Sequence, residues 1–250
     1  MQVAHEQASS LDRAVAHINE GPFTPARVTT MTLEAKLSAE GLCKMTLLLL
    51  VGLIDDDDPD GFSQMPQRKK AGHFFNQVTI RHGKRSIKIF MNGTLHITGC
   101  KSIPEALEVA ALACRFVHRV LVGESAPRVV SFRVDMINMN FSVGTRLQLV
   151  QLQGECHAQG LRASYDPDIY PGLNIKLPVD DGGDDGAATT TKPVTANVFK
   201  SGSVLLSGAK TGAHLCGAYG ELCRVLETYR LAQNKIAALS TSPPPPPCPA

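Results

Sequence analysis

One stretch of this sequence occurs twice. The first copy runs from Phe90 to Lys101 and the second from Phe199 to Lys210, without a gap, at an offset of 199 − 90 = 109 residues. The Phe, both Gly and the final Lys are identical in the two copies. Each copy reads as a strand, a tight turn at Asn92-Gly93 or Ser201-Gly202, a second strand and the start of a helix. A unit repeated once at this spacing predicts two similar half-domains and argues against a solenoid of many short repeats.

The repeat extends upstream as a pair of residue types. Phe75 lies six residues before Arg81 and Tyr170 lies six residues before Lys176, and both pairs have an offset of 176 − 81 = 95 residues. Each half is therefore expected to carry an aromatic ring and a cation at matching positions.

These motifs support a resemblance to a known family. The stretch Tyr165–Leu173, followed by Phe199–Lys210, resembles the second half of the TATA-binding protein core, and Phe90–Lys101 resembles the equivalent segment of its first half. The resemblance covers about residues 26 to 230. It implies an α+β fold in which two pseudo-symmetric half-domains form one curved antiparallel sheet, a saddle, with helices on the convex face.

The resemblance divides the chain into four parts. They are an N-terminal helical extension at 1–25, a first repeat at 26–124 with an acidic insertion at about 55–61, a second repeat at 125–239 with an insertion of disordered type at about 180–192, and a Pro-rich tail at 240–250.

Local patterns predict most of the elements. Alternating apolar residues predict strands, and capping residues predict helix starts. Strands are expected at 28–33, 78–81, 86–90, 95–98 and 129–138, and helices at 39–50, 102–121 and 213–239. The N-terminal helix is expected to begin after Ser9 or Ser10 and to end at Gly21-Pro22. The segment 146–152 fits either a strand or a helix.

Two helices show regular apolar faces. The helix after the capping box Ser102-x-x-Glu105 is expected to bury one face, made of Leu107, Ala111, Cys114, Val117 and Leu121. The last helix has a heptad pattern, which favours packing on the sheet and leaves pairing with a second helix as the alternative.

Charge and cysteine content exclude some classes of protein. The net charge is +2, so a DNA-binding surface has to come from local clustering of cations. Seven Cys without a Cys-x-x-Cys motif favour a reducing, intracellular compartment over a disulfide framework.

The longest apolar run, Leu47–Ile54, is too short to span a bilayer. The acidic run from Asp55 to Asp60 lacks the spaced ligands of a calcium loop, so we expect a solvated loop and no metal site.

The resemblance also implies which residues meet DNA. In the family, the concave face lies on the minor groove, apolar wedges enter base steps, and cations hold the flanking phosphates. The wedge positions are Phe75, Phe90, Tyr170 and Phe199, and the phosphate positions are Arg81, Lys176, Lys101 and Lys210. Thr98 and Ser207 match hydroxyls near the centre, and Asn138 matches a central Asn whose first-half partner is lost at Ala26 or Arg27.

Three positions depart from the family pattern. Lys88, Asn197 and His96 stand where the family has apolar residues that touch bases, and the counterpart of His96 in the other half is Leu205. These changes make the expected DNA-binding face more polar and put its A·T preference in doubt.

Three functions are weighed. The first is a minor-groove-binding and DNA-bending initiation factor, in the nucleus or at a site of viral transcription, whose partners are promoter DNA, a transcription-factor-IIB-like factor and the RNA polymerase machinery. The second is a saddle-shaped protein-interaction module with reduced DNA binding, and dimerisation through the last helix is a further option. The third, an enzyme, is disfavoured because no nucleophile motif, phosphate loop or spaced metal-ligand cluster is found. No cofactor is implied.

Overall fold

The computed structural model describes residues 2–23, 25–38, 42–54, 58–64, 76–121, 125–180 and 192–240. Phe75, residues 55–57, the insertion at 181–191 and the tail at 241–250 lie outside the described residues. Five helices and ten strands are described in this part of the chain. The helices are α1 (Gln2–Asn19), α2 (Lys44–Gly52), α3 (Ile103–His118), α4 (Leu149–Ala158) and α5 (Gly212–Ser240). The strands are β1 (Arg27–Leu37), β2 (Phe62–Gln64), β3 (Gln77–His82), β4 (Arg85–Phe90), β5 (Thr94–Cys100), β6 (Val129–Ser142), β7 (Arg162–Ser164), β8 (Gly172–Leu177), β9 (Val194–Phe199) and β10 (Ser203–Ala209).

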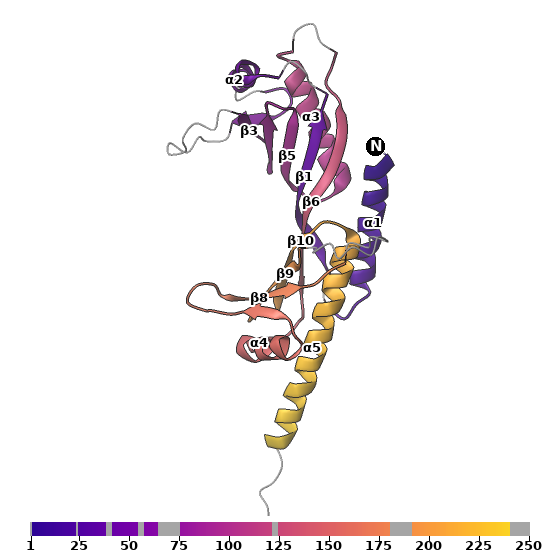
Figure 1. Ribbon diagram of the computed structural model, residues 1–250, viewed down its shortest axis with the longest axis vertical. Helices are drawn as coiled ribbons and strands as arrows, with labels where there is room; N and C mark the ends of the chain where they lie inside the picture. Colours follow the sequence, from indigo (N-terminus) through magenta and orange to yellow (C-terminus); the bar gives the residue numbers. More distant parts are fainter. Residues whose placement is uncertain are drawn as a thin grey trace, which may run out of the picture.

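All ten strands form one antiparallel sheet in the order β2-β3-β4-β5-β1-β6-β10-β9-β8-β7. The first five strands of the chain make one half of this sheet and the last five make the other half in mirrored order. The long strands β1 and β6 pair at the centre and join the halves. The expected saddle of two pseudo-symmetric half-domains is therefore confirmed (Figure 1).

The strand register locates the pseudo-twofold axis of the sheet. Met31 on β1 pairs with Ile137 on β6, and these two residues pair in turn with Cys100 and Ala209. Cys100 and Ala209 differ by 209 − 100 = 109 residues, which is the offset of the repeated stretch. Since Met31 and Ile137 occupy equivalent places, the axis passes through their pair, and equivalent residues of β1 and β6 differ by 137 − 31 = 106.

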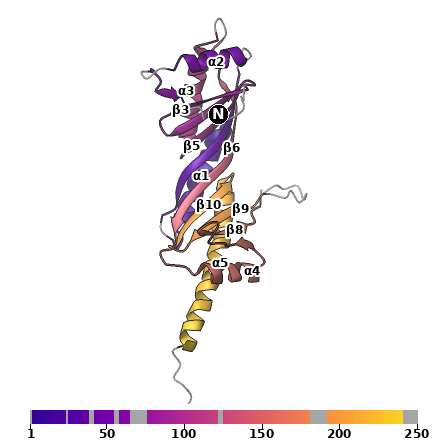
Figure 2. The ribbon, with the colours of Figure 1, turned by 90° about the vertical axis from the view of Figure 1, so that its left-hand side faces the viewer.

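Within the described residues, one face of the sheet carries the helices and the other does not. On β1, Met31, Leu33, Ala35 and Leu37 are buried and alternate with partly exposed residues, as a strand with one covered face requires. Helix α3 packs on the first half and α5 on the second, and α1 lies against both helices (Figure 1). We call the opposite, helix-free side of the sheet the open face (Figure 2).

The N-terminal helix docks on this core, but its start was predicted wrongly. Helix α1 begins at Gln2 and runs through Ser9 and Ser10. Its buried residues Leu11 and Ile18 belong to the core, so tertiary packing outweighs the weak capping signal. A Cβ on Gly212 would lie 2.8 Å from the carbonyl oxygen of Ser10, so α1 and α5 touch where a side chain would not fit.

The acidic run is not wholly a solvated loop. Asp58 is buried, and its carboxylate accepts a hydrogen bond of 2.6 Å from Arg119 Nη1 and others from the backbone amides of Asp60 and Phe62. Arg119 also pairs with Asp60. The expectation of a solvated insertion is therefore wrong for Asp58, because the cation at the end of α3 lies too far along the sequence to be recognised as its partner.

Helix α3 starts as predicted, but part of its expected face is wrong. The Glu105 amide donates to Ser102 Oγ at 3.3 Å, which confirms the N-cap, and Cys114 and Val117 are buried. Leu107 and Ala111 are not among the buried residues. The buried face contains Ile103, Ala106, Val109, Ala110, Ala113, Cys114, Phe116 and Val117. Small Ala residues allow the close approach of α3 to the sheet, and a search for large apolar side chains overlooks them.

The remaining ambiguous segments are resolved by tertiary contacts. Residues 149–158 form helix α4, which packs against α5 and β7. Leu215, Ala218, Leu222 and Val225 of α5 are buried, so the expected packing of the last helix on the sheet is confirmed for these residues. Leu231 is 57% exposed, and the last turns of α5 extend past the sheet (Figure 1).

None of the helices in the described part of the chain has the length and apolarity needed to cross a bilayer.

Candidate nucleic-acid interface

The open face presents the residues that alternate with the core. Strand pairing aligns them in transverse rows, because directly paired residues of antiparallel strands point to the same face. The first-half row consists of Thr79, Lys88, His96, Glu34 and Arg133. The second-half row consists of their equivalents Asn174, Asn197, Leu205, Asn140 and Arg27. The pseudo-twofold axis relates one row to the other.

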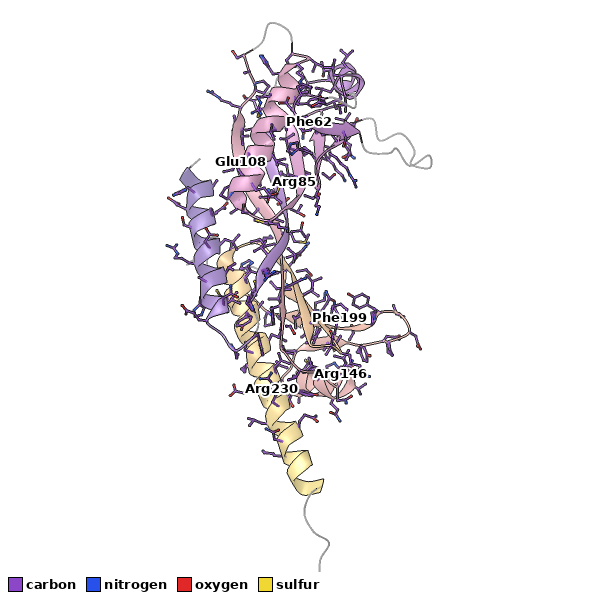
Figure 3. The ribbon with its side chains drawn as sticks, turned by 180° about the vertical axis from the view of Figure 1, so that it is seen from behind. Phe62, Arg85, Glu108, Arg146, Phe199 and Arg230 are labelled. Atoms are coloured by element: carbon purple, nitrogen blue, oxygen red, sulfur yellow. The ribbon has the colours of Figure 1, made fainter. Side chains whose placement is uncertain are left out.

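The aromatic positions lie at the outer ends of the strands. Phe199 ends β9 on the side of the sheet away from α1 and α5 (Figure 3), and its ring centroid lies 5.9 Å from that of Tyr170. Tyr170 is 42% exposed. Phe90 ends β4 at the equivalent place and makes an edge contact with His96, with ring centroids 5.3 Å apart. Phe75, the fourth expected wedge, lies outside the described residues.

Gly172 makes the close approach of the two second-half rings possible. It pairs with Phe199 across β8 and β9, and a Cβ there would lie 2.8 Å from the Tyr170 ring and 3.1 Å from the Phe199 ring. The two rings therefore share a site that a larger residue would crowd.

The expected phosphate-binding cations occupy two different environments. Arg81 on β3 and Lys176 on β8 lie at equivalent places on the open face, and Lys176 Nζ donates to Thr195 Oγ1 at 2.9 Å. Lys101 and Lys210 are exposed and stand at the junctions of β5 with α3 and of β10 with α5. Lys101 also lines a depression beside α1 residues Leu11 and Asp12. Arg81 and Lys176 thus lie on the open face beside the two rows. Lys101 and Lys210 lie at the edge of the helical layer.

The centre of the face carries small polar side chains. Thr98 pairs with Thr32, and Ser207 and Asn138 occupy the equivalent places in the second half. The register therefore makes Thr32 the counterpart of Asn138, and not Ala26 or Arg27. Asn138 Oδ1 is buried and has no hydrogen-bond partner within the described ranges.

The first-half row contains an ion-pair network that the sequence pattern did not reveal. Arg133 Nη2 donates to Glu34 Oε2 at 3.1 Å, and Arg133 Nε donates to Asp135 Oδ1 at 2.7 Å. His96 Nε2 lies 3.3 Å from Glu34 Oε2. The hydrogen bond from Arg133 to Asp135, reinforced by the charges of Asp135 and Glu34, raises the pKa of Arg133 above its usual range. Arg133 therefore holds Glu34 across the β1–β6 pair and Asp135 on its own strand.

A β-bulge brings Asp135 into this network. The register of β1 and β6 shifts between Thr32 and Leu33, so Asp135 is the extra residue on β6. Glu34, His96 and Asp135 offer ligand atoms within 4.8 Å of one another, a spacing that suits a metal ion. Arg133 donates to both carboxylates, however, and its guanidinium already supplies the positive charge at that place.

The second-half row keeps the cation, since Arg27 is the equivalent of Arg133, but it has no counterpart of the carboxylates. Asn174 Nδ2 donates to Asn197 Oδ1 at 2.9 Å, and the following places are taken by Leu205 and Asn140. Asn140 is the equivalent of Glu34, and Leu205 is the equivalent of His96. The open face is thus symmetric in its backbone and asymmetric in its chemistry.

The sequence alone did not identify Glu34, Arg133 and Asp135 as site residues. Glu34 could have been found from the sequence, because it is a charged residue at a position of the strand that alternates with the apolar core residues. Its partners are not readable in this way, because Glu34 and Arg133 are separated by 99 residues and meet only through the strand register.

Comparison with known proteins agrees with this geometry. The family described as "Transcription factor TFIID (or TATA-binding protein, TBP)" matches residues 131–229. The TATA-box-binding protein of Caenorhabditis elegans is 29% identical over 156 residues, covering 61% of this chain and 40% of that protein. The TATA-box-binding protein 1 of Triticum aestivum is 27% identical over 158 residues, covering 63% of this chain and 60% of that protein. The chain thus spans about 40% to 60% of the length of these relatives.

A viral relative and a solved structure extend the comparison. A TATA-box-binding protein-like protein of Acanthamoeba polyphaga mimivirus is 25% identical over 195 residues, which is 65% of this chain and 50% of that protein. The structure of the Methanococcus jannaschii TBP superposes with a TM-score of 0.53 at 16% identity, covering 82% of this chain and 98% of that one. This last likeness shows a shared fold.

Proposed function

We propose, from the premise that the chain is a TATA-binding-protein-like protein, that it binds the minor groove of duplex DNA with its open face and bends the duplex as a transcription initiation factor. The observation that carries the proposal is the pair of Phe90 and Phe199 at equivalent outer ends of one continuous sheet, each partly exposed on the helix-free side. The two repeats, 26–124 and 125–239, would each supply one half of the DNA-binding surface.

The physical role of each residue class follows from its place on the face. Aromatic rings at the two ends insert between base steps and unstack them, and the duplex bends away from the protein. Phe199 and Tyr170 form the wedge of the second half, and Phe90, with Phe75, forms that of the first half. Thr98, Ser207 and Asn138 face the central base pairs with small polar groups. Lys88 and Asn197 stand next to these positions, where they contact the groove floor or a phosphate.

The remaining parts of the proposal concern charge and partners. Arg81 and Lys176, with Lys101 and Lys210, neutralise phosphates on both sides of the groove and release counterions. The helical side stays free for a transcription-factor-IIB-like factor and the polymerase machinery, and the exposed end of α5 near Leu231 offers a place for dimerisation. The protein would act in the nucleus or at a site of viral transcription.

A specific observation favours a second candidate, a protein-interaction module with the same fold. Glu34 and Asp135 place carboxylates on the central strands of the open face. Negative charge opposes the approach of a polyanion, so this face would instead bind a basic protein segment.

The experiment is fluorescence transfer between dyes at the two ends of short duplexes, one with a TATA element and one rich in G·C pairs. A large change in transfer on protein addition is expected on at least one duplex. A change on the TATA duplex alone indicates the A·T preference of the family, and a change on both indicates relaxed readout. A folded protein that changes neither contradicts the proposal and supports the interaction module.

A further inference from the structure

The two transverse rows of the open face differ most at one pair of equivalent positions, Glu34 and Asn140. We propose that Glu34 accepts a hydrogen bond from the exocyclic amino group of guanine, so that the first half of the face selects a G·C pair and the second half does not. This inference rests on the proposed minor-groove binding and adds a sequence preference and a direction of binding to it.

The first step concerns hydrogen-bond complementarity. The floor of the minor groove at an A·T pair offers only acceptors, adenine N3 and thymine O2, whereas a G·C pair adds the guanine N2 amino donor. An ionised carboxylate is an acceptor only. A carboxylate facing an A·T floor therefore meets lone pairs and repulsive partial charge, and the guanine amino group is the donor in the groove that complements it.

The second step concerns the position of the carboxylate. Glu34 lies on β1, one of the two central strands, three residues from Met31 on the pseudo-twofold axis. Its side chain is 32% exposed on the open face. A carboxylate at this place contacts the floor of a minor groove that covers the open face.

The third step concerns how the carboxylate is held. Its contacts with Arg133 and His96 both use Oε2. They fix the orientation of the group and leave Oε1 for the groove. A pre-oriented acceptor loses little side-chain entropy when it binds a base edge.

The fourth step accounts for the other charged groups that face Glu34. Arg133 lies on the neighbouring strand β6 and is shared with Asp135, so its charge offsets one of the two carboxylates, and Lys88 in the same row carries a second cation. His96 and Lys88 follow in the same row toward the sheet edge, where donors suit the O2 and N3 acceptors or a phosphate. Asp135 accepts the shorter bond from Arg133, at 2.7 Å, and stands at the bulge outside the transverse row. Glu34, whose bond from Arg133 is 3.1 Å, is therefore the carboxylate that stands in the row and faces a base.

The equivalent position supplies an internal contrast. Asn140 carries an amide, which donates as well as accepts and so tolerates either base pair. Leu205 and Asn197 on one side of it are uncharged, and Arg27 on the other side is the equivalent of Arg133. A preference for G·C is expected under one half only, and this preference would orient the pseudo-symmetric protein on an asymmetric site.

The test compares guanine with hypoxanthine, which pairs with cytosine but lacks the N2 amino group. A single G·C or I·C pair is scanned through an otherwise A·T duplex, and the affinity of the whole chain is measured by fluorescence anisotropy at fixed salt. Wild-type protein is expected to bind the G·C duplex about fivefold or more tightly than the I·C duplex at one or two adjacent positions in one half of the site. This comparison needs no variant.

Two matched variants assign the effect to one side chain. Glu34→Val removes the acceptor and introduces a β-branched residue suited to a strand, and its G·C to I·C ratio is expected to fall to about one. Asn140→Val makes the same change at the equivalent position and is expected to leave the wild-type ratio. Thermal unfolding of both variants verifies that they are folded.

The outcomes separate this inference from the proposed function. A protein that binds and bends DNA with equal affinity for G·C and I·C at every position overturns the role of Glu34 and leaves the proposed function intact. A preference for G·C that persists in folded Glu34→Val also overturns it. A protein that binds none of the duplexes overturns both.

Discussion

At the scale of single residues, Arg119 is the side chain with the clearest structural task. Its guanidinium pairs with Asp58 and Asp60 and lies 5.1 Å from the centroid of the Phe116 ring. The Asp58 side chain is only 1% exposed. Together these contacts fix the loop before β2 to the end of α3.

Arg119→Ala is expected to lower the free energy of unfolding by about 3 kcal/mol, because it leaves a buried carboxylate without its cation. Denaturant unfolding of both proteins measures the difference. Arg115→Ala is the matched control on the same helix. Arg115 is 61% exposed and lies 3.8 Å from Asp60, so its loss should change stability by no more than about 0.5 kcal/mol. Equal effects of the two changes would contradict the buried-pair assignment.

Asp58 also predicts an acid sensitivity. Burial raises the pKa of this carboxyl, but hydrogen bonds from Arg119 and from the Phe62 and Asp60 amides lower it more, so the pKa lies below its ordinary value of 3.8. A depressed pKa in the folded state stabilises the fold above the unfolded-state pKa, and the contribution is lost as pH falls through the folded-state value. Stability of the wild type should therefore decline below about pH 4, and this part of the decline should be absent in Asp58→Asn. A pH series of urea midpoints for the two proteins measures it.

The wedge residues give the third prediction at this scale. Phe90→Ala and Phe199→Ala are each expected to abolish most of the duplex bending, because each removes a ring at the end of the sheet that holds a base step open. Both side chains are partly exposed, so the fold should survive. End-to-end fluorescence transfer on a bound duplex reports the bend and circular dichroism reports the fold. Unchanged bending by both variants would remove these residues from the wedge.

At the scale of elements, the contact of α1 with α5 depends on a small residue. Gly212→Ala is expected to loosen α1, because the new Cβ would lie 2.8 Å from both Ala14 Cβ and the Ser10 carbonyl oxygen, and such overpacking costs about 1–3 kcal/mol. Faster hydrogen exchange across α1 is the expected signal. Gly220→Ala on the same helix is the control, since nothing lies within 4 Å of its added Cβ, and it should stabilise α5 by about 0.5–1 kcal/mol. Unchanged exchange in Gly212→Ala would show that the contact is not tight.

The elements that could be predicted are those with strong local signals. The hairpins at Asn92-Gly93 and Ser201-Gly202 and the capped start of α3 follow from turn and capping chemistry. The short strands β2 and β7 were not predicted. Each has only three residues and exists because a longer neighbouring strand, β3 or β8, offers it a paired edge. A pattern of three residues carries no period that a sequence can display.

At the scale of the whole molecule, the repeat predicted two similar half-domains because the duplicated frame fixes equivalent strands in both, and the family resemblance implied the saddle that they form. The repeat also located Phe90, Phe199, Thr98 and Ser207 at equivalent places. It could not predict the network of Glu34, since its partners are 62 and 99 residues away and depend on the β1–β6 and β1–β5 register. The chemical asymmetry of the open face is therefore a property of tertiary structure.

The shared sheet predicts how the molecule unfolds. Because β1 and β6 pair along most of their length and α1 packs on both α3 and α5, the halves share one core and should unfold in a single transition. Scanning calorimetry checks this by comparing the calorimetric and van't Hoff enthalpies, which should agree. Two separate transitions would show that the halves are independently stable.

The packing of α1 against α5 has a consequence for the order of events during synthesis. The first helix of the chain completes its burial only against the last one, and β1 finds its partner β6 about a hundred residues later. While translation proceeds, Leu11, Ile18 and the outer edge of β1 stay without their final neighbours. Such a nascent chain exposes an apolar helix and an unpaired strand edge for many seconds, the circumstances in which chaperones are needed. For the same reason, a chain truncated before α5 lacks the main packing partner of α1, and its first helix stays exposed.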